Sequence, residues 1–381
     1  MLLSVGTAAN FRKIFQRVGG CSLSAVAARH GTGLTTVCDG YAGLMRVVIF
    51  GATGNVGSAL VRSLEKEDRV TSIVGVARRL PLDVGASAGG DKVTWDVRDI
   101  SYDELDVVAD ADVVVDLAWK IQPSHHEATM LRTNVIGTHR VMDAVALHSV
   151  PSFVYASSVG TYAPHPKHSR ADESWSAAGI PSSTYSRHKA EVEKILDTFE
   201  RAHSDIRVVR MRTSLVFQRS AASEIHRLFL GRLLPWHLPR PLRLVPNVAR
   251  LQFQATHADD IADAYRRAIV GDVAGAFNVA AEPVLDPKLI ADTVAGRTVP
   301  LPETLLRKAA AVTYRLRIQP SEPGWLDMAL QTPLMDTTRA RNELGWVPAK
   351  TSVEALAELL DGIGDGSGYT TLPLHPRGRA G

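Results

Sequence analysis

Short apolar runs alternate with longer amphipathic stretches from residue 46 to about residue 210. Runs of nearly continuous apolar residues are typical of strands that are buried on both faces of a parallel sheet. The intervening stretches have helical periodicity, and such βαβ alternation predicts an α/β fold with a doubly wound parallel sheet. The predicted strands are Val47–Phe50, Ser72–Val76, Val113–Leu117, Phe153–Ala156 and Val208–Met211, and the predicted helices are Val56–Leu64, Ala128–Leu147 and Tyr185–Arg201.

Beyond residue 213 this alternation loosens. Leu228–Pro246 mixes leucines with arginines, and its prolines interrupt any long helix. A strand is still predicted at Phe277–Ala280 and a helix at Val353–Leu360. We therefore expect a sheet core over residues 45–213, a smaller substrate lobe over 214–362 that is interleaved with the end of the core, and a flexible tail over 363–381.

The first 44 residues differ in composition from the rest of the chain. They carry several basic residues before the first acid, Asp39, and Phe11, Ile14, Phe15 and Val18 fall at helical spacing. A basic amphipathic segment of this kind is typical of organelle-targeting peptides. The alternative, which we favour, is that the protein starts at Met45 and that residues 1–44 are a poorly ordered extension.

The composition narrows the class of protein. A net charge of +3 is too small to indicate nucleic-acid binding, and no apolar run reaches the ~18–20 residues of a membrane-spanning helix. The cysteines, Cys21 and Cys38, both precede the first predicted strand, so the rest of the chain has no disulfide, thiolate nucleophile or cysteine metal site. These features favour a cytoplasmic protein, although the cysteine usage fits equally an oxidising compartment in which no disulfide is needed.

A glycine pattern follows the first predicted strand and opens the first predicted helix. Gly51, Gly54 and Gly57 have the spacing of a turn that holds the pyrophosphate of a dinucleotide, in a Rossmann-type sheet. The amides at the start of the helix then face the phosphates with the positive end of the helix dipole. Thr53, Asn55 and Val56 lie within the same turn and are candidate cofactor contacts.

The end of the second predicted strand bears on which dinucleotide is bound. An acid at this place hydrogen-bonds the ribose 2′-hydroxyl of NAD, whereas a basic residue accommodates the 2′-phosphate of NADP. The strand ends in Arg78 and Arg79 with no acid, which favours NADP over NAD. Asp96 and Val97 end the next predicted strand and are expected to border the adenine.

Tyr185 and Lys189 are one helical turn apart, so on a helix they share a face. A free tyrosine is a poor base at neutral pH, but a nearby ammonium and an oxidised nicotinamide favour the phenolate and lower its pKa. A serine that hydrogen-bonds the substrate oxygen would complete the arrangement, and Ser157-Ser158 follows a predicted strand. This set predicts hydride transfer at a carbonyl with Tyr185 as the acid/base.

Together these motifs resemble the short-chain dehydrogenase/reductase superfamily, specifically its extended branch, the NAD-dependent epimerase/dehydratase family, over about residues 45–362. Val113–Ala118 resembles the strand that flanks the nicotinamide ribose, which implies cofactor contacts by Leu117 and Ala118. Asn134–Thr138 is similar to the helix motif that carries an active-site asparagine. Two later segments, Gln254–Ala262 and Leu344–Pro348, also match the family in order.

The resemblance implies a role for each matching residue. Ser158 would polarise the substrate oxygen, with Ser157 as the alternative in a shifted register. Tyr185 would be the acid/base, Lys189 would bind the nicotinamide ribose and tune Tyr185, and Asn134 would hold a proton-relay water. Family members often dimerise through two helices, one bearing the tyrosine and lysine, so a homodimer is expected by analogy.

Departures from the family pattern narrow the reaction. Dehydratases of the family place an Asp-Glu pair where Val159-Gly160 follows Ser158, so sugar dehydration is disfavoured. Many nucleotide-sugar epimerases carry an arginine where this chain has Phe253, with Arg250 three residues earlier. The leading hypothesis is an NAD(P)-dependent oxidoreductase that interconverts a hydroxyl and a carbonyl on a small or moderately lipophilic molecule. Such an enzyme exchanges its cofactor in each turnover. The rivals are an epimerase that retains NAD and a non-catalytic, NADP-binding redox sensor.

Two weaker signals remain. The arginines and Trp236 of Ile225–Pro246 are consistent with an acidic or phosphorylated substrate or a lipid-like ligand, but also with a solvated lobe surface. His125-His126 and His165/His168 lack the acids or cysteines that would complete a metal site, so no metal is expected.

Overall fold

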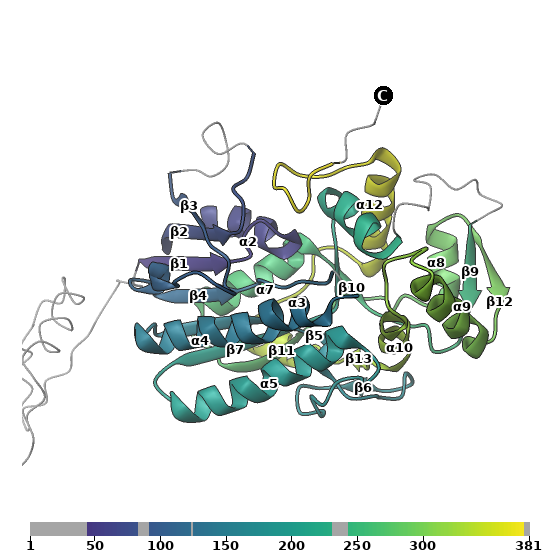
Figure 1. The fold of residues 1–381 in the computed structure, drawn as a ribbon, viewed down its shortest axis with the longest axis horizontal. Coiled ribbons are helices and arrows are strands. Elements are labelled where there is room, and N and C mark those ends of the chain that lie inside the picture. The colour runs from purple at the N-terminus through teal and green to yellow at the C-terminus, as the bar shows by residue number, and fades with distance from the viewer. Residues whose placement is uncertain (1–43, 83–90, 123–124, 231–242, 377–381) are drawn as a thin grey trace, which may run out of the picture. The chain divides into compact units, whose positions relative to one another are not determined.

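A computed structural model describes residues 44–82, 91–122, 125–230 and 243–376. Within these ranges the core is a seven-stranded sheet in the order β11-β7-β5-β4-β1-β2-β3, with every neighbouring pair parallel (Figure 1). The predicted doubly wound parallel sheet is therefore confirmed. The strands are β1 (Met45–Phe50), β2 (Val70–Ala77), β3 (Val93–Val97), β4 (Val113–Asp116), β5 (Ser152–Ser158), β7 (Arg207–Thr213) and β11 (Gly275–Val279).

Helices cover both faces of this sheet (Figure 1). α2 (Asn55–Glu65) and α7 (Ala258–Val270) pack on one face, and α4 (Thr138–Leu147) and α5 (Thr184–Ala202) pack on the other. Successive strand residues point to opposite faces, so Val47 and Ile49 join the first core whereas Val48 and Phe50 join the second. The apolar runs are continuous because both faces are buried.

The strand order reverses between β1 and β4. Chain leaving β1 passes to β2 on one side, whereas β4 and β5 build the sheet on the other side. In open α/β sheets, ligands bind at such a switch point, in the crevice at the carboxyl ends of the strands. The switch point therefore lies beside the glycine turn.

The remaining elements are short strands and helices, some of which, such as α9 and β12, lie beyond the right-hand end of the sheet in Figure 1. We refer to the chain past residue 213, apart from α7 and β11, as the lobe. Two elements past residue 213, α7 and β11, belong to the core. The others are β6 (Arg170–Ala171), β8 (Leu215–Phe217), α6 (Ala222–Ile225), β9 (Leu244–Asn247), β10 (Ala255–His257), α8 (Pro287–Thr293), β12 (Arg297–Pro300), α9 (Glu303–Arg315), α10 (Pro323–Gln331), β13 (Leu334–Met335), α11 (Thr338–Glu343) and α12 (Ser352–Asp365).

Two expectations need correction. The single helix expected over Ala128–Leu147 is instead α3 (Glu127–Leu131), a π-helical segment Arg132–Gly137, and α4. The tail expected to be flexible from residue 363 is instead packed in its described part. α12 continues to Asp365, and Leu374 is fully buried. Apolar burial at Leu374 outweighs the glycines and prolines that make this segment read as a tail.

Candidate active site

The glycine turn requires glycine at two positions. Gly51 has a φ of +78°, and a Cβ there would lie 2.8 Å from the carbonyl carbon of Leu117. A Cβ at Gly57 would lie 2.3 Å from the carbonyl oxygen of Gly51. Gly54, at the N-cap of α2, supplies no side-chain cap, so the first amides of the helix keep the capacity to bind an anion. This cradle fits the pyrophosphate of a dinucleotide.

The other residues of the turn face in different directions. Asn55 donates to the carbonyl of Val216 in β8 at 2.9 Å, so its side chain ties the turn to the lobe. The buried carbonyl of Thr53 accepts a hydrogen bond from Thr371 at 2.8 Å. Val56 packs against the core on the α2 side of the sheet.

The structure brings the remaining candidate cofactor residues to the same carboxyl edge. Leu117 and Ala118 adjoin Gly51, as the crowding at that glycine shows. Arg78 and Arg79 are exposed just after β2. Val97, the last residue of the edge strand β3, is 52% exposed.

Asp96 is engaged within the protein. Its carboxylate accepts from Nε of Arg98 at 3.1 Å, so this acid is already paired. Lys120 is a second positively charged residue close to Arg78. Burial, with repulsion from Arg78, lowers the pKa of Lys120 below its ordinary value.

Ser158 and Tyr185 lie together at the carboxyl end of β5. The hydroxyl of Ser158 accepts from the amide of Gly160 at 3.0 Å and shares a hydrogen bond with Tyr185. Burial raises the pKa of Tyr185 to about 12, and the bond with Ser158 opposes that rise only in part. In this state Tyr185 is protonated and set to act as an acid.

Gly160 makes room for the Tyr185 ring. A Cβ on this glycine would lie 2.9 Å from Cε1 of Tyr185 and 2.9 Å from the sulfur of Met328. A glutamate at this position would displace the tyrosine. The local packing therefore agrees with the absence of the acid pair that the resemblance associates with dehydratases.

Ser157 faces away from Tyr185. Its hydroxyl donates to the buried carboxylate of Glu193 at 2.5 Å, and Arg212 binds both oxygens of that carboxylate, at 3.0 and 2.9 Å. Burial alone would raise the pKa of Glu193, but Arg212 lowers it to about 2. Ser157 is thus fixed in a buried ionic network that also includes Arg210.

Lys189 is 2% exposed and lies between three aromatic rings. Its ammonium donates to the hydroxyl of Tyr155 at 3.2 Å and to the carbonyl of Ala156, and it sits 3.4 Å from the centroid of Trp119. Burial lowers the pKa of Lys189 to about 7, although Asp116 and Glu193 act to raise it. Lys189 shares its helix face with Tyr185, as the spacing predicts, and its ammonium lies 5.9 Å from the Tyr185 ring centroid.

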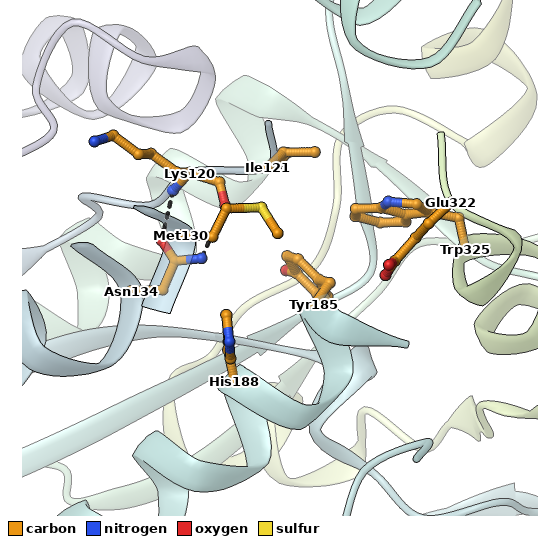
Figure 2. Close-up of a pocket in the computed structure, with 8 residues that line it drawn as sticks. All are labelled: Lys120, Ile121, Met130, Asn134, Tyr185, His188, Glu322 and Trp325. Atoms are coloured by element: carbon orange, nitrogen blue, oxygen red, sulfur yellow. Dashed lines mark hydrogen bonds between the residues drawn. The ribbon is translucent and has the colours of Figure 1, made fainter. Parts of the chain in front are cut away.

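Asn134 explains the π-helical segment. Its amide nitrogen donates to the carbonyl of Lys120 at 2.8 Å, and its amide oxygen accepts from the backbone N–H of Lys120 at 2.7 Å (Figure 2). The widened helical turn lets this side chain reach the backbone after β4, and such π-turns frequently mark functional sites. One N–H and one lone pair of Asn134 remain for a water.

A small pocket opens beside Tyr185 (Figure 2). Trp325 from α10 forms one wall, with its ring centroid 4.8 Å from that of Tyr185, and the Lys120 ammonium points away from the tyrosine. Glu322 accepts from the backbone N–H and hydroxyl of Thr184, at 2.7 and 2.9 Å, and so holds the start of α5. The pocket is lined by Lys120, Ile121, Met130, Asn134, Tyr185, His188, Glu322 and Trp325.

Sequence reasoning missed two polar residues here. His188 lines the pocket, is 4% exposed, and has no hydrogen-bond partner for either ring nitrogen among the described residues. Burial lowers its pKa, so the ring is neutral. Asp116 is 1% exposed beside Tyr155 in the adjacent strand, and burial raises its pKa to about 6. The spacing of His188 from Tyr185, three residues along one helix, is the signal that would have identified it.

The weaker sequence signals gain no support as a site. Arg227 donates to the carbonyl of Pro373, and Arg243 donates to that of Val294 at 2.9 Å. Arg232, Trp236 and Arg240 lie outside the described residues.

His125 stacks on Tyr314, and His165 packs edge-on against Trp175. Within the described ranges no cluster of three or more His, Cys, Asp or Glu is placed to hold a metal. None of the helices described there has the length and apolar character needed to cross a membrane.

Comparison with known proteins identifies the family of the chain. The sequence model of the NAD dependent epimerase/dehydratase family matches residues 47–280. An uncharacterized protein of Mycobacterium tuberculosis is 26% identical over 316 residues, which cover 82% of this chain and 29% of that protein. A dTDP-glucose 4,6-dehydratase of Streptomyces antibioticus is 29% identical over 180 residues, or 44% of this chain and 52% of the enzyme. The chain thus spans less than a third of the first curated relatives it matches.

Solved structures share the fold. The UDP-glucuronic acid 4-epimerase of Bacillus cereus in complex with NAD has a TM-score of 0.62 at 15% identity, covering 84% of this chain and 99% of that enzyme. At this identity the likeness shows the fold alone.

Proposed function

Because the chain belongs to the NAD-dependent epimerase/dehydratase family, we propose that it is an NAD(P)-dependent oxidoreductase that interconverts a hydroxyl and a carbonyl. The observation that carries this proposal is the contact between Ser158 and Tyr185, a tyrosine that lines a pocket, with Lys189 on the same helix face. The glycine turn lies on the same edge of the sheet.

When bound, the nicotinamide would supply or accept the hydride. Ser158 would orient the substrate oxygen by a hydrogen bond, and Tyr185 would donate its phenolic proton to that oxygen during reduction or remove the proton during oxidation. Burial keeps Tyr185 protonated, so the ammonium of Lys189 must support the phenolate that forms. Trp119 and Trp325 exclude water around this proton transfer.

We propose that the cofactor is NADP rather than NAD. Arg78 and Arg79 stand exposed after β2, and Asp96, the acid that ends the next strand, is bonded to Arg98. An exposed pair of guanidinium groups suits the 2′-phosphate of NADP. The solved relative named above contains NAD, which is why the two cofactors must be compared directly.

The second candidate is an epimerase that retains its NAD and runs the same hydride transfer in both directions. The Bacillus cereus structure, a 4-epimerase, favours it at the level of fold. Sugar dehydration, the other reaction that the family is named for, is disfavoured. Val159-Gly160 replaces the acid pair of dehydratases, and Gly160 packs on Tyr185.

One experiment separates these readings. The purified protein is analysed by mass spectrometry for bound dinucleotide, titrated with NADPH and NADH, and then assayed on a panel of carbonyl compounds, alcohols and UDP-sugars. An empty site that prefers NADP, with turnover lost in Tyr185→Phe, supports the proposal. Tightly retained NAD with UDP-sugar epimerisation supports the second candidate. Dinucleotide binding without any turnover contradicts both and leaves the redox sensor.

A further inference from the structure

The described part of the C-terminal segment reaches the glycine turn. The hydroxyl of Thr371 donates to the carbonyl of Thr53 at 2.8 Å, and the two residues are 2% and 6% exposed. This bond occupies a carbonyl of the turn and leaves its N–H groups for a ligand. We call residues 366–376 the C-terminal strap.

Two further anchors lie on either side of that contact. The carbonyl of Thr370 accepts from the backbone N–H of Leu82 at 3.0 Å, four residues after Arg78. At the other end, the carbonyl of Ser367 accepts from the hydroxyl and the backbone N–H of Ser223 in α6, at 2.7 and 3.1 Å. The strap therefore joins the lobe, the glycine turn and the chain leaving β2.

The strap is closed on itself. Tyr369 donates through its backbone to the carbonyl of Leu374 at 2.9 Å, and Leu374 donates to that of Thr371 at 3.0 Å. Leu374 is fully buried, and a Cβ on Gly368 would lie 2.3 Å from the carbonyl oxygen of Leu374. A loop whose ends are bonded and whose side chains fill its centre keeps its shape, so the strap presents Thr370 and Thr371 in fixed positions.

We propose that the C-terminal strap is a third component of the dinucleotide site and limits the release of bound dinucleotide. The proposal rests on the proposed function, because it assumes that the glycine turn and Arg78 hold a dinucleotide. The strap touches the turn at Thr53 and is bonded to the chain that follows Arg78. A dinucleotide held at both places therefore leaves the site only if the strap moves.

The first test removes one hydroxyl. Thr371→Val keeps the shape of the side chain and deletes its bond to Thr53. Release of NADPH and of NADH is followed by stopped-flow fluorescence while an excess of the oxidised dinucleotide displaces it. Loss of one buried hydrogen bond predicts release that is about two- to tenfold faster.

The matched control is Thr313→Val. This threonine also donates to a backbone carbonyl at 2.8 Å, that of Ala309, but within α9 and away from the glycine turn. It should release dinucleotide at the wild-type rate. If Thr371→Val also releases both dinucleotides at the wild-type rate, the strap does not limit release and the proposal is wrong.

A second measurement needs no variant. Amide hydrogen exchange of the full-length chain is recorded with and without NADPH, and α12 serves as the internal reference for general stabilisation. If NADPH binding slows exchange more in the strap than in α12, the proposal is supported. If binding slows exchange equally in both segments, the proposal is wrong.

The outcomes keep the two hypotheses apart. A wild-type chain that binds neither NADPH nor NADH refutes the proposed function, and the strap proposal falls with it. A chain that binds dinucleotide normally, with release and exchange that are insensitive to the strap, refutes the strap proposal alone.

Discussion

At the scale of single residues, burial determines the chemistry of the candidate site. It raises the pKa of Tyr185 to about 12 and lowers that of Lys189 to about 7, so each group is pushed toward its neutral form. A neutral tyrosine holds the proton that reduction requires. Burying the Lys189 ammonium lowers the folding stability, but its positive charge stabilises the phenolate that forms on Tyr185.

Lys189→Met should stabilise the fold and abolish turnover. In the folded chain the pKa of Lys189 is below its unfolded value of 10.5, so below about pH 7 the folded protein bears the full penalty of a buried charge, and the penalty fades as the pH rises toward the unfolded pKa. The gain should be about 1–4 kcal/mol near pH 6 and smaller near pH 9, measured by urea unfolding. Lys194→Met, on the exposed side of the same helix, should show no such pH dependence.

The two neighbouring serines give a matched pair. Ser158→Ala removes the partner of Tyr185 and should lower kcat by about 100-fold with little loss of stability. Ser157→Ala removes a donor to the buried carboxylate of Glu193 and should cost about 1.5–3 kcal/mol of unfolding free energy with a far smaller effect on kcat. If Ser157→Ala instead lowered kcat and Ser158→Ala lowered stability, Ser157 would be the residue that contacts the substrate.

His188 gives a further residue-scale prediction. Its ring lines the pocket with neither nitrogen hydrogen-bonded among the described residues, and Nε2 lies 3.8 Å from a carboxylate oxygen of Glu127, so we expect a substrate atom or a water to bond the ring when the site is filled. His188→Phe keeps the burial and removes both nitrogens. It should raise KM by about tenfold and leave NADPH affinity unchanged, and an unaltered KM would contradict a contact with substrate.

At the scale of elements, the position of α5 depends on a distant part of the chain. Glu322, just before α10, bonds the first turn of α5 at Thr184, and Trp325 packs on Tyr185. A Cβ on Gly324 would lie 2.4 Å from the carbonyl of Ser182, so α10 sits directly on the chain entering α5. The lobe therefore fixes the helix that carries Tyr185.

Glu322→Gln should weaken this arrangement. The loss of a carboxylate at a helix start predicts a decrease of about 1 kcal/mol in unfolding free energy, and the shift of Tyr185 predicts about tenfold lower turnover. Glu354→Gln is the control, because Glu354 also accepts from the backbone N–H and the hydroxyl of a threonine, Thr351, at the N-terminus of α12. It should lose similar stability and keep full turnover.

Elements were predictable from the sequence where local pattern and tertiary packing agree. β1 and α2 follow from an apolar run and helical periodicity, and Gly51 and Gly57 from the spacing of the turn. The π-helical segment was not predictable, because its cause is the bond between Asn134 and the backbone of Lys120, 14 positions earlier. For the same reason, nothing local distinguishes Ser157 from Ser158: the partner of Ser157, Glu193, is 36 residues away.

At the scale of the whole molecule, the net charge of +3 conceals a local concentration of positive charge. Arg78 and Lys120 lie close enough at the carboxyl edge of the sheet to act on each other, with Asp99 as an acid that acts on both, while Asp96 is paired with Arg98. A field of this sign at the mouth of the site attracts a polyanionic ligand.

Arg78→Ala should therefore weaken NADPH binding more than NADH binding. The loss of one charge-assisted contact to a phosphate predicts an increase in the NADPH Kd of about 10- to 100-fold, measured by fluorescence titration. The NADPH Kd of the wild-type chain should also rise more steeply with salt than the NADH Kd. Arg201→Ala, on the far end of α5, is the control. Equal effects of Arg78→Ala on both dinucleotides would contradict a 2′-phosphate contact.

The bond between Thr371 and Thr53 joins positions that are 318 residues apart. During synthesis on the ribosome the N-terminal part of a chain emerges and folds first. The sheet and its glycine turn are therefore complete well before residue 371 leaves the exit tunnel. A nascent chain that has folded this far has a glycine turn that the strap does not yet contact.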